Sequence, residues 1–507
     1  MIADKSSRFR IKSYWAILLF FSIFYYIVNF VLTPNDFFPV HQDDYILLGR
    51  GFQDMGLFME RPVTLNIAYL VSEFGMLPSF LLVSALVVIV PMLIVVFLEK
   101  LFDIRFQWYS LVLFSAITFG HFSAFENGKY LGSVVGMSGL LGSLTLLIMI
   151  MAFKKNEGKY VAMALIGYAL TCFSREDFLL PPLILLTLLY LNTYLRFSKK
   201  LTQENIFTYR RTIVASGIIM LLIASLSVLL SIKVGSRFAN MFSASSAAVD
   251  PYAVKLTFSS LINSFHKLTF EFIPAPTIFA LLGIIVILFS HRDKRLELIT
   301  AAFIIIAIML PYTMIPNNLP AYRVVSWLPW FAAIGCIGTQ TMICKMEKRL
   351  GSGAAMVGIG LIVGSSIYVL LQYDSERKGI AAWYSGQQII NKNIIGTLQQ
   401  NRGLITKERI VAIRGIEGLS PWGNTDAQFL RNKLGFQNKW MLFVSGSNAF
   451  NTVNYNDATG SLHATDQRQY VLVAPISRMC DMPDMLIIDF DGKGLGEPLR
   501  TNQLCHN

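Results

Sequence analysis

Residues 76–98 read "MLPSFLLVSALVVIVPMLIVVFL", a run of 23 positions without a charged side chain. A helix of this length and composition is long enough to cross the hydrocarbon core of a bilayer. The rest of the chain has the same character, because 54% of its 507 residues are hydrophobic and only 15% are charged. Soluble domains carry about 25% charged residues. The sequence therefore predicts a polytopic α-helical membrane protein.

Apolar runs of similar length recur along the chain and give eleven predicted spans. They cover about 14–33, 76–98, 106–120, 133–153, 160–174, 178–195, 212–232, 273–290, 297–315, 324–344 and 351–372. The first run follows four basic residues, as a signal peptide would. It is longer than the apolar region of a signal peptide and lacks the small-residue cleavage pattern, so we expect a retained span.

The distribution of basic residues predicts the orientation of these spans. With the amino terminus in the cytoplasm, the loops on that side hold 20 Lys and Arg in about 55 residues, and the loops on the other side hold 9 in about 90. Such an excess marks the cytoplasmic face of membrane proteins. It also accounts for most of the net charge of +12. We find no basic stretch interleaved with aromatics, which argues against nucleic-acid binding.

The composition changes after the last span, which divides the chain into residues 1–372 in the membrane and 373–507 outside it. Residues 375–400 are predicted as a helix. Four short apolar runs bounded by turn residues are predicted as buried strands of a small α/β domain: "RIVAIRG" (409–415), "WMLFVSG" (440–446), "YVLVAP" (470–475) and "MLIIDF" (485–490). Trp422 and Tyr455 of this domain either stack on sugar rings or belong to its core.

The five cysteines divide between the two parts of the chain. Cys172 and Cys336 lie within predicted spans and Cys344 at the inner end of one, whereas Cys480 and Cys505 lie in the outer domain. A disulfide between Cys480 and Cys505 is chemically permitted there, and two buried thiols are the alternative.

Charged residues gather in the predicted outer loops rather than inside the spans. Charges within spans mark ion paths, so this pattern favours chemistry at the outer membrane face over ion-coupled transport. No glycine-rich nucleotide-binding motif follows a predicted strand. The candidate residues are Asp43, Asp44 and Arg61 in the first outer loop (about 34–62), Glu126 and Lys129 in the second, Arg175 in the third and Arg323 in the fifth.

The first outer loop contains the most informative motif. Apolar residues from Tyr45 to Met59 recur at helical spacing, which predicts a helix lying on the membrane surface. Such a helix would hold Asp43 and Asp44 at the boundary between lipid and water. Partial desolvation strengthens a carboxylate as a base, so either aspartate is a candidate base for a headgroup reaction. The alternative is that both are solvated loop acids or helix caps.

The basic residues suit a phosphate in the substrate. The planar guanidinium of arginine binds two phosphate oxygens at once, so Arg175, Arg323 and Lys129 are candidates to stabilise a phosphate leaving group. The candidate charged residues also have structural alternatives. Arg61–Pro62 is a possible helix start, Glu126 and Lys129 a possible exposed pair, Arg175 part of an ordinary turn, and Arg323 a headgroup anchor. His41 could join Asp43 and Asp44 as a ligand of a divalent metal, or be a surface histidine.

One span followed by an outer loop with paired acids, "HQDDYILLGRGFQDMGLFMERPV" (41–63), resembles the GT-C class of membrane glycosyltransferases. Asp43–Asp44 followed about seventeen residues later by Arg61–Pro62 resembles the O-antigen-modifying glucosyltransferases of enteric bacteria and their phages. The resemblance covers the span layout and terminal domain, but its specific motifs cover only about thirty residues. Met59 and Glu60 precede the Arg-Pro where the family often has small residues, so the role of Arg61 is less defined.

The resemblance implies a bacterial inner-membrane enzyme that moves a hexose, namely glucose, from undecaprenyl phosphate to a glycan hydroxyl in the periplasm. It makes Asp43 or Asp44 the catalytic base, places a second acid at Glu126, and makes a lipid-phosphate donor, an O-antigen-like acceptor and the bilayer the partners. No cofactor is expected, although some members of the class use a divalent metal. Two rival functions are a glycan polymerase or ligase and a flippase for lipid-linked sugars.

Overall fold

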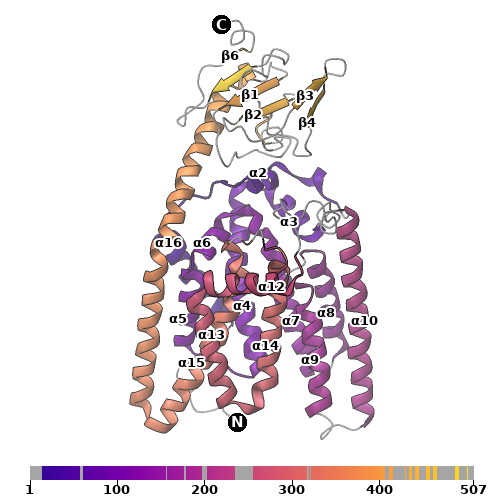
Figure 1. Ribbon diagram of the computed structural model, residues 1–507, viewed down its shortest axis with the longest axis vertical. Helices are drawn as coiled ribbons and strands as arrows, with labels where there is room; N and C mark the ends of the chain where they lie inside the picture. The colour runs from indigo at the N-terminus through magenta and orange to yellow at the C-terminus, as the bar shows by residue number, and fades with distance from the viewer. Residues whose placement is uncertain are drawn as a thin grey trace.

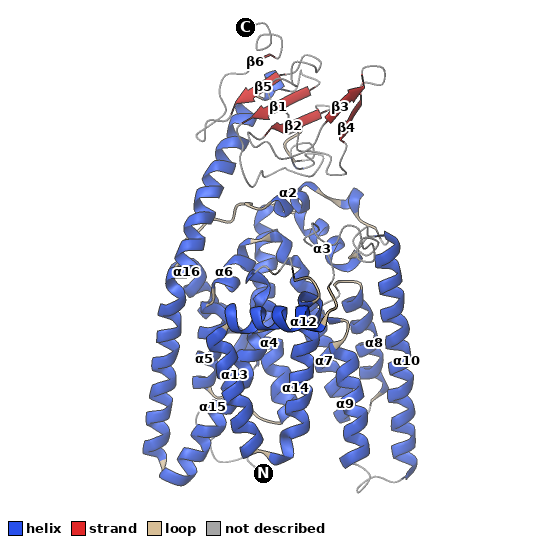
Figure 2. Ribbon diagram, in the orientation of Figure 1, coloured by secondary structure: helices blue, strands red, loops and turns tan. Residues whose placement is uncertain are grey.

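The fold is seen in a computed structural model of the full chain. The structure describes residues 14–56, 61–155, 157–175, 178–196, 203–234, 255–316, 319, 321–405, 410–414, 429, 433–436, 440–444, 453–456, 461–464, 486–489 and 499–500. Long helices run side by side in a bundle, and the strands lie together beyond one end of it (Figures 1 and 2). We call this the sheet end of the bundle.

Each of the eleven predicted apolar runs falls largely on a helix, which confirms the polytopic helical class. The helices are α1 (Tyr14–Tyr26), α4 (Met76–Phe102), α5 (Trp108–Gly120), α7 (Met137–Lys155), α8 (Gly158–Cys172), α9 (Pro181–Arg196), α10 (Gln203–Val234), α13 (Pro274–Ser290), α14 (Arg295–Thr313), α15 (Leu328–Leu350) and α16 (Ser352–Gln400). Within the described residues six helices are long and apolar enough to cross a bilayer, or eight if two bent pairs are each one span. The count of eleven therefore remains a prediction.

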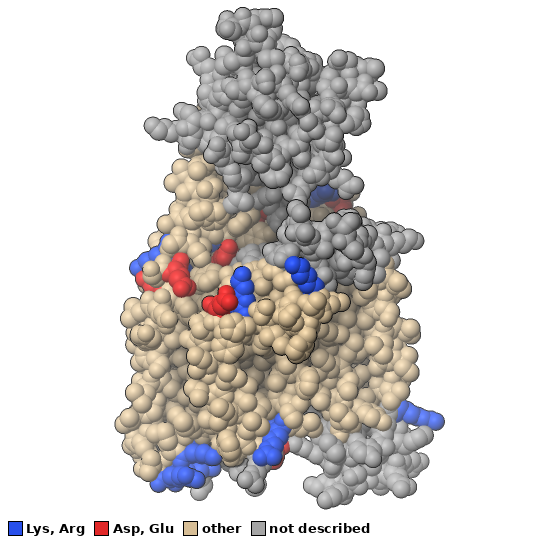
Figure 3. Space-filling model, viewed as in Figure 1, with Lys and Arg blue, Asp and Glu red and all other residues tan. Residues whose placement is uncertain are grey.

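The surface of the bundle fits a bilayer. Figure 3 shows charged side chains at two levels, with a broad belt of uncharged residues between them. The α13–α14 and α15–α16 turns, both predicted to be cytoplasmic, lie opposite the sheet end (Figure 1). Helices α13 and α15 approach closely, because a Cβ atom on Gly283 would lie 2.6 Å from the Ile334 carbonyl oxygen. Small residues allow such backbone approach in membrane bundles.

Short helices complete the described chain and connect the long ones. They are η2 (Ile27–Val31), α2 (Gln42–Gly49), η3 (Phe52–Asp54), α3 (Pro62–Ser72), α6 (Phe122–Lys129), η4 (Leu131–Gly136), α12 (Phe258–His266), η7 (Lys267–Glu271), η8 (Arg292–Lys294), η9 (Ala321–Ser326) and α17 (Arg402–Ile405). Two sharp bends separate apolar helices: 60° between α5 and α6, and 97° between η7 and α13.

A small sheet lies beyond the bundle. Its order is β2 (Trp440–Val444), β1 (Ile410–Arg414), β5 (Leu486–Asp489), β6 (Leu499–Arg500), with β1 parallel to β2 and β5, and β6 antiparallel to β5. The strands β3 (Val453–Asn456) and β4 (Ser461–Ala464) form a separate antiparallel pair. Three of the four predicted strands are therefore present, and 470–475 lies outside the described residues, as do Cys480 and Cys505. The free cysteines 172 and 336 are buried, and Cys344 is partly buried.

Helix α16 runs unbroken from Ser352 to Gln400, so the predicted boundary at residues 372 and 373 falls inside one helix. Beyond the bundle its polar face binds the extended chain that follows α1. The Asn35 amide donates to the Ala381 carbonyl (2.9 Å), and the Gln388 amide donates to the Asp36 and Phe38 carbonyls (2.9 and 3.2 Å). The Asn391 amide donates to the Pro39 carbonyl (3.2 Å).

The buried side chain of Arg377 anchors α16 at the level where it leaves the bundle. Its Nε donates to Thr33 Oγ1 (2.8 Å), its Nη1 to the Gly120 carbonyl (3.0 Å), and its Nη2 to Asp374 Oδ1 (2.7 Å). The side chain is only 1% exposed. One guanidinium thus connects α16 to the end of α5 and to the chain after α1.

Replacing Arg377 with alanine should lower the free energy of unfolding by about 2–3 kcal/mol, because it removes hydrogen bonds of a buried charge. The measurement is unfolding of the purified protein in detergent. Lys378→Ala is the matched control: Lys378 pairs with the same Asp374 carboxylate but is 62% exposed, so its loss should cost less than about 1 kcal/mol. Equal effects of the two substitutions would contradict an anchoring role for Arg377.

Candidate active site

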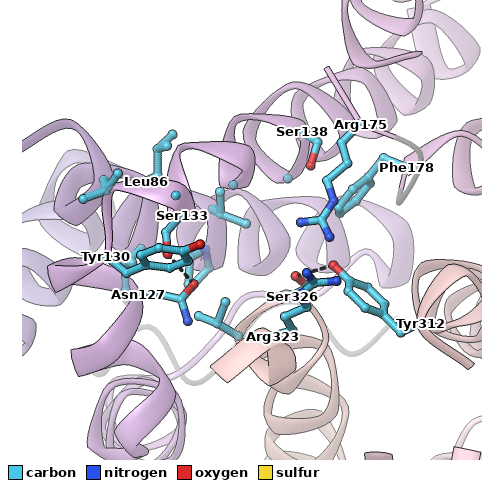
Figure 4. A pocket seen from close by; sticks show the side chains of 18 of the residues that line it. Leu86, Asn127, Tyr130, Ser133, Ser138, Arg175, Phe178, Tyr312, Arg323 and Ser326 are labelled. Carbon is cyan, nitrogen blue, oxygen red and sulfur yellow. Dashed lines mark hydrogen bonds between the residues drawn. The ribbon is translucent and has the colours of Figure 1, made fainter. Parts of the chain in front are cut away.

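A cavity of about 190 Å³ lies toward the sheet end of the bundle, between α4, α6, η4, α7 and η9 (Figure 4). Its walls are of two kinds, one polar and cationic and one apolar. It is lined by Arg61, Val83, Leu86, Val87, Val90, Pro91, Asn127, Tyr130, Gly132, Ser133, Gly136, Ser138, Gly139, Arg175, Phe178, Tyr312, Arg323, Val325 and Ser326.

Three of the four basic residues singled out in the sequence meet in this cavity. Arg61 is the residue before α3, Arg175 follows α8, and Arg323 lies on η9. They are separated by more than a hundred positions in each step along the chain. The sequence offered each as a separate candidate, and the fold brings them to one place.

Backbone pairing explains how Arg61 and Arg175 become neighbours. The Val63 amide donates to the Phe173 carbonyl (3.2 Å), and the Thr64 hydroxyl donates to the Ser174 carbonyl (3.1 Å). The start of α3 is thereby tied to the end of α8. Pro62 at the first position of α3 favours a helix start there, since its missing N–H needs no partner. Arg61 is thus a helix start as well as a lining residue of the cavity.

Tyr312 holds the other two arginines on the same side of the cavity. The guanidinium carbon of Arg175 lies 5.5 Å from the centre of its ring, and that of Arg323 lies 5.7 Å from it. Such distances are those of cation–π contacts. Figure 4 shows both guanidinium groups pointing into the same space, with Ser326 beside the Tyr312 hydroxyl at 3.4 Å. Arg175 is 7% exposed, so its charge lies in a largely desolvated place.

The charged residues that line the cavity suit an anionic ligand. Arginine stays protonated at all physiological pH values, and among the described residues that line the cavity none is acidic. The apolar wall consists of Val83, Leu86, Val87 and Val90. Phe178 adds a further apolar side chain beside Arg175 (Figure 4). A molecule with an anionic group and an apolar part would satisfy both walls.

The third wall is built by α6 and η4. His121 caps α6 after the bend, since its Nδ1 accepts the Ser123 amide (3.2 Å). Asn127 accepts the Ser133 hydroxyl at its Oδ1 (2.8 Å), which ties α6 to η4. Tyr130 lies over Gly132, where a Cβ atom would be 2.3 Å from the Tyr130 ring. These polar side chains line the cavity opposite the arginines (Figure 4).

Asp44 lies close to this third wall but is fully buried in protein. Its Oδ2 accepts the amides of Val40 (3.0 Å) and His41 (2.9 Å), and its Oδ1 accepts the Leu131 amide (2.7 Å). Leu131 directly follows Tyr130 and begins η4. The carboxylate therefore caps α2 and ties it to η4, as a structural reading of the motif predicts.

The surface helix predicted for the first outer loop is wrong. Helix α2 ends at Gly49, and Tyr45 and Leu48 are buried in a cluster with Phe429, Phe436 and Leu486 from beyond α16. The rings of Tyr45 and Phe429 lie 5.1 Å apart. The first part of the apolar stripe therefore packs inside the protein, whereas Phe52 and Met55 are exposed. Amphipathic spacing alone cannot distinguish a protein partner from lipid.

The remaining candidates occupy different places. Asp43 lies on α2, and its side chain is outside the described part. His41 precedes α2 and shares a 2.6 Å hydrogen bond between its Nε2 and the Tyr384 hydroxyl. Glu126 is partly buried on α6 beside Asn127, but it is not among the residues that line the cavity. Among the described residues no group of three or more His, Cys, Asp or Glu could hold a metal ion.

Lys129 points away from the cavity. Its Nζ donates to the carbonyls of Asn35 (2.9 Å) and Asp36 (3.3 Å) and lies over the rings of Phe30 (4.3 Å) and Phe37 (4.1 Å). Its contacts are those of a clamp between α6 and the chain after α1.

The sequence matches no protein-family model and no curated protein. The chain is similar to the crystal structure of ArnT from Cupriavidus metallidurans in the apo state, with a TM-score of 0.48 and 11% identity over 94% of this chain and 93% of that chain. For ArnT bound to undecaprenyl phosphate the TM-score is 0.49, with the same identity and coverage. This similarity assigns no residue and no activity to the present chain.

Asp44→Asn should lower the free energy of unfolding by about 1–3 kcal/mol, because an amide NH₂ cannot accept and leaves a buried N–H facing a donor. The measurement is thermal and chemical unfolding in detergent. Asp36→Asn is the control. Its side chain is 70% exposed, and the Lys392 ammonium, through a hydrogen bond and its charge, lowers the pKa of this carboxyl. Its cost should stay below about 1 kcal/mol, and an equally small cost for Asp44→Asn would contradict the capping role.

Proposed function

We propose that the chain is a membrane glycosyltransferase that moves a sugar from a polyprenyl-phosphate donor to a hydroxyl group of a glycan. The observation that carries this proposal is the meeting of Arg61, Arg175 and Arg323 in one cavity that also has an apolar wall. A lipid-linked sugar phosphate has a matching arrangement, since its phosphate lies between an isoprenoid chain and a sugar.

The arginines suit the phosphate of the donor in particular. A phosphodiester carries one negative charge, and its charge grows as the bond to the sugar breaks. Guanidinium groups fixed around the phosphate stabilise the transition state more than the ground state when they match the developing charge. Three arginines also supply the neutralisation that a divalent cation provides in other phosphate chemistry. Tyr312 keeps two of them in place before the donor arrives.

The apolar wall suits the first isoprene units of the donor. It belongs largely to α4, where Pro91 removes the helical hydrogen bond to the carbonyl four residues earlier. Gly136 and Gly139 face it from η4 and α7 and leave room that larger side chains would fill. The isoprenoid chain of the donor would therefore extend from the cavity, between helices, toward the lipid.

The reaction we propose is a single displacement with inversion. The acceptor oxygen forms a bond to the anomeric carbon while the bond from that carbon to the phosphate oxygen breaks. The electron pair of the broken bond stays on the polyprenyl phosphate, and the acceptor proton passes to a carboxylate base. General base catalysis of this kind contributes about 10²–10⁴-fold.

We assign the base to Asp43 and a positioning role to Asp44. The three amide hydrogen bonds to the Asp44 carboxylate occupy it and hold α2 against η4. Asp43 is its neighbour on the same short helix and is carried by that anchor. Glu126 is kept as a second acid, close in sequence to the cavity residue Asn127.

The finer parts of the proposal rest on the resemblance of the first outer loop to O-antigen-modifying glucosyltransferases. They are a glucose donor, an O-antigen or related glycan as acceptor, and a site on the periplasmic side of a bacterial inner membrane. A polymerase or ligase, or a flippase for lipid-linked sugars, would use the same carrier lipids. Sugar transfer by the Asp43 and Asp44 variants distinguishes a transferase from these alternatives.

Arg175→Ala should weaken binding of undecaprenyl phosphate at least about tenfold, because a charge-assisted hydrogen bond is worth about 1.5–3 kcal/mol. Binding is measured on the purified protein in detergent. Arg50→Ala is the matched control, since Arg50 pairs with Asp54 at 2.9 Å and does not line the cavity. If Arg175→Ala binds the lipid as tightly as Arg50→Ala does, the cavity is not the phosphate site.

Asp43→Asn should reduce glucose transfer from undecaprenyl-phosphate glucose to lipopolysaccharide by a factor of about 100 or more, as expected for a missing base. Binding of the donor should stay at the wild-type level. The transfer assay uses radiolabelled donor, and the unfolding temperature shows whether the variant is intact.

Asp44→Asn is the comparison for that experiment. Its loss of transfer should follow its loss of folded protein. Full transfer by folded Asp43→Asn would exclude Asp43 as the base. Translocation of the lipid-linked sugar by wild type without any transfer would favour the flippase.

A further inference from the structure

A group of aromatic side chains lies beside the cavity, where α2, α6 and α16 approach one another. The ring of His41 lies 4.6 Å from that of Tyr130, 5.4 Å from that of Tyr384 and 5.8 Å from that of Trp383, measured between centres. We call these four residues the aromatic group. Of these four residues only Tyr130 also lines the cavity.

Trp383 is the exposed member of the group. Its side chain is 40% exposed although one side of it faces His41 and Tyr384, whose rings lie 5.8 and 5.2 Å away. Tyr384, in contrast, is fully buried and fixes His41 through the hydrogen bond to its Nε2. The group therefore offers one rigidly supported aromatic surface to the outside.

The height of Trp383 on α16 excludes an ordinary membrane anchor. Tryptophan anchors lie at the level of the lipid headgroups. On α16 the salt bridges of Asp374 with Arg377 and Lys378 mark the first charged level after the apolar part of the helix. Trp383 comes nine residues after Asp374, which is about 14 Å farther along a helix. The exposed face of the Trp383 indole at that height is available to a ligand.

The chemistry of the group fits a sugar ring. A hexose has faces of C–H groups and edges of hydroxyl groups. Aromatic surfaces accept the first, and the imidazole and phenol groups of His41 and Tyr130 can hydrogen-bond the second. Isoprenoid chains stay in the bilayer and do not reach this height. The donor sugar belongs at the arginines, so a sugar on the aromatic group belongs to the other substrate.

We propose that Trp383, with His41 and Tyr130, forms a subsite for a neutral hexose residue of the acceptor glycan. The inference rests on the proposed function. Asp43 follows His41 by two residues on α2, and Tyr130 reaches the cavity. An acceptor held by the aromatic group is therefore led toward both the base and the donor. Trp383 is a binding residue for the acceptor and takes no part in the bond changes.

The test measures binding of methyl α-D-glucopyranoside, methyl α-L-rhamnopyranoside and methyl β-D-galactopyranoside to the full chain in detergent by saturation-transfer NMR, without donor. Wild type should bind at least one of these glycosides. Trp383→Ala should weaken that binding at least about tenfold, and Trp383→Phe, which keeps an aromatic face, about threefold or less. Tyr368→Ala is the matched control, because Tyr368 is a 67% exposed aromatic on the apolar part of the same helix.

Binding of undecaprenyl phosphate is measured on the same samples to separate this inference from the proposed function. Trp383→Ala should bind the lipid phosphate as wild type does. If wild type binds no glycoside, or if Trp383→Ala binds it unchanged, the acceptor subsite is refuted while lipid-phosphate binding leaves the proposed function standing. If wild type binds glycoside through Trp383 but no lipid phosphate, the subsite stands as a sugar site and the proposed donor fails.

Discussion

The polar face of α16 provides the hydrogen bonds on which the sheet end of the molecule depends. The chain between η2 and α2 forms no regular helix from residue 34 to 40, and among the described strands none pairs with its carbonyl groups. Buried carbonyl groups need donors, and α16 supplies them through the side chains of Gln388 and Asn391. Arg377 donates to the Thr33 hydroxyl at the start of this segment. Because this segment leads directly into α2, its position decides where Asp43 and Asp44 lie.

A series of hydrogen bonds connects α2 to the cavity. Asp44 holds the start of η4 through the Leu131 amide, and η4 in turn holds Asn127 on α6 through Ser133. The arginine wall is fixed independently, by the pairing of α3 with the end of α8 and by Tyr312. The two halves of the site are thus supported by different helices, and the space between them is the cavity.

The sequence predicted the helices well because lipid imposes a long apolar run on each of them. It also singled out Arg61, Arg175 and Arg323 as candidates, since an arginine at the outer end of a span stands out against an apolar background. It could not predict that they share one cavity, because contacts between segments more than a hundred residues apart leave no mark on local composition. Tyr130, Tyr312 and Trp383 had no signal in the sequence, because aromatic residues are common throughout the chain and these three do not stand out.

The wrong expectations have a common physical origin. The stripe of α2 and the charge of Lys129 were each assigned the partner that the sequence made most obvious, lipid for one and phosphate for the other. In the fold both are used internally: Tyr45 contacts Phe429, and Lys129 binds carbonyl groups between two phenylalanine rings. Periodicity and charge show that a side chain needs a partner, and only the fold shows which partner it has.

The central claim is that the arginine-lined cavity binds the phosphate of a polyprenyl-phosphate sugar. The most direct measurement is the position of the phosphorus atom in a cryo-electron microscopy structure of the full chain with undecaprenyl phosphate. We expect phosphate oxygens about 2.7–2.9 Å from guanidinium nitrogens of at least two of Arg61, Arg175 and Arg323, with the isoprenoid chain along α4. A phosphate bound outside this cavity, with the three arginines unoccupied, would contradict the account.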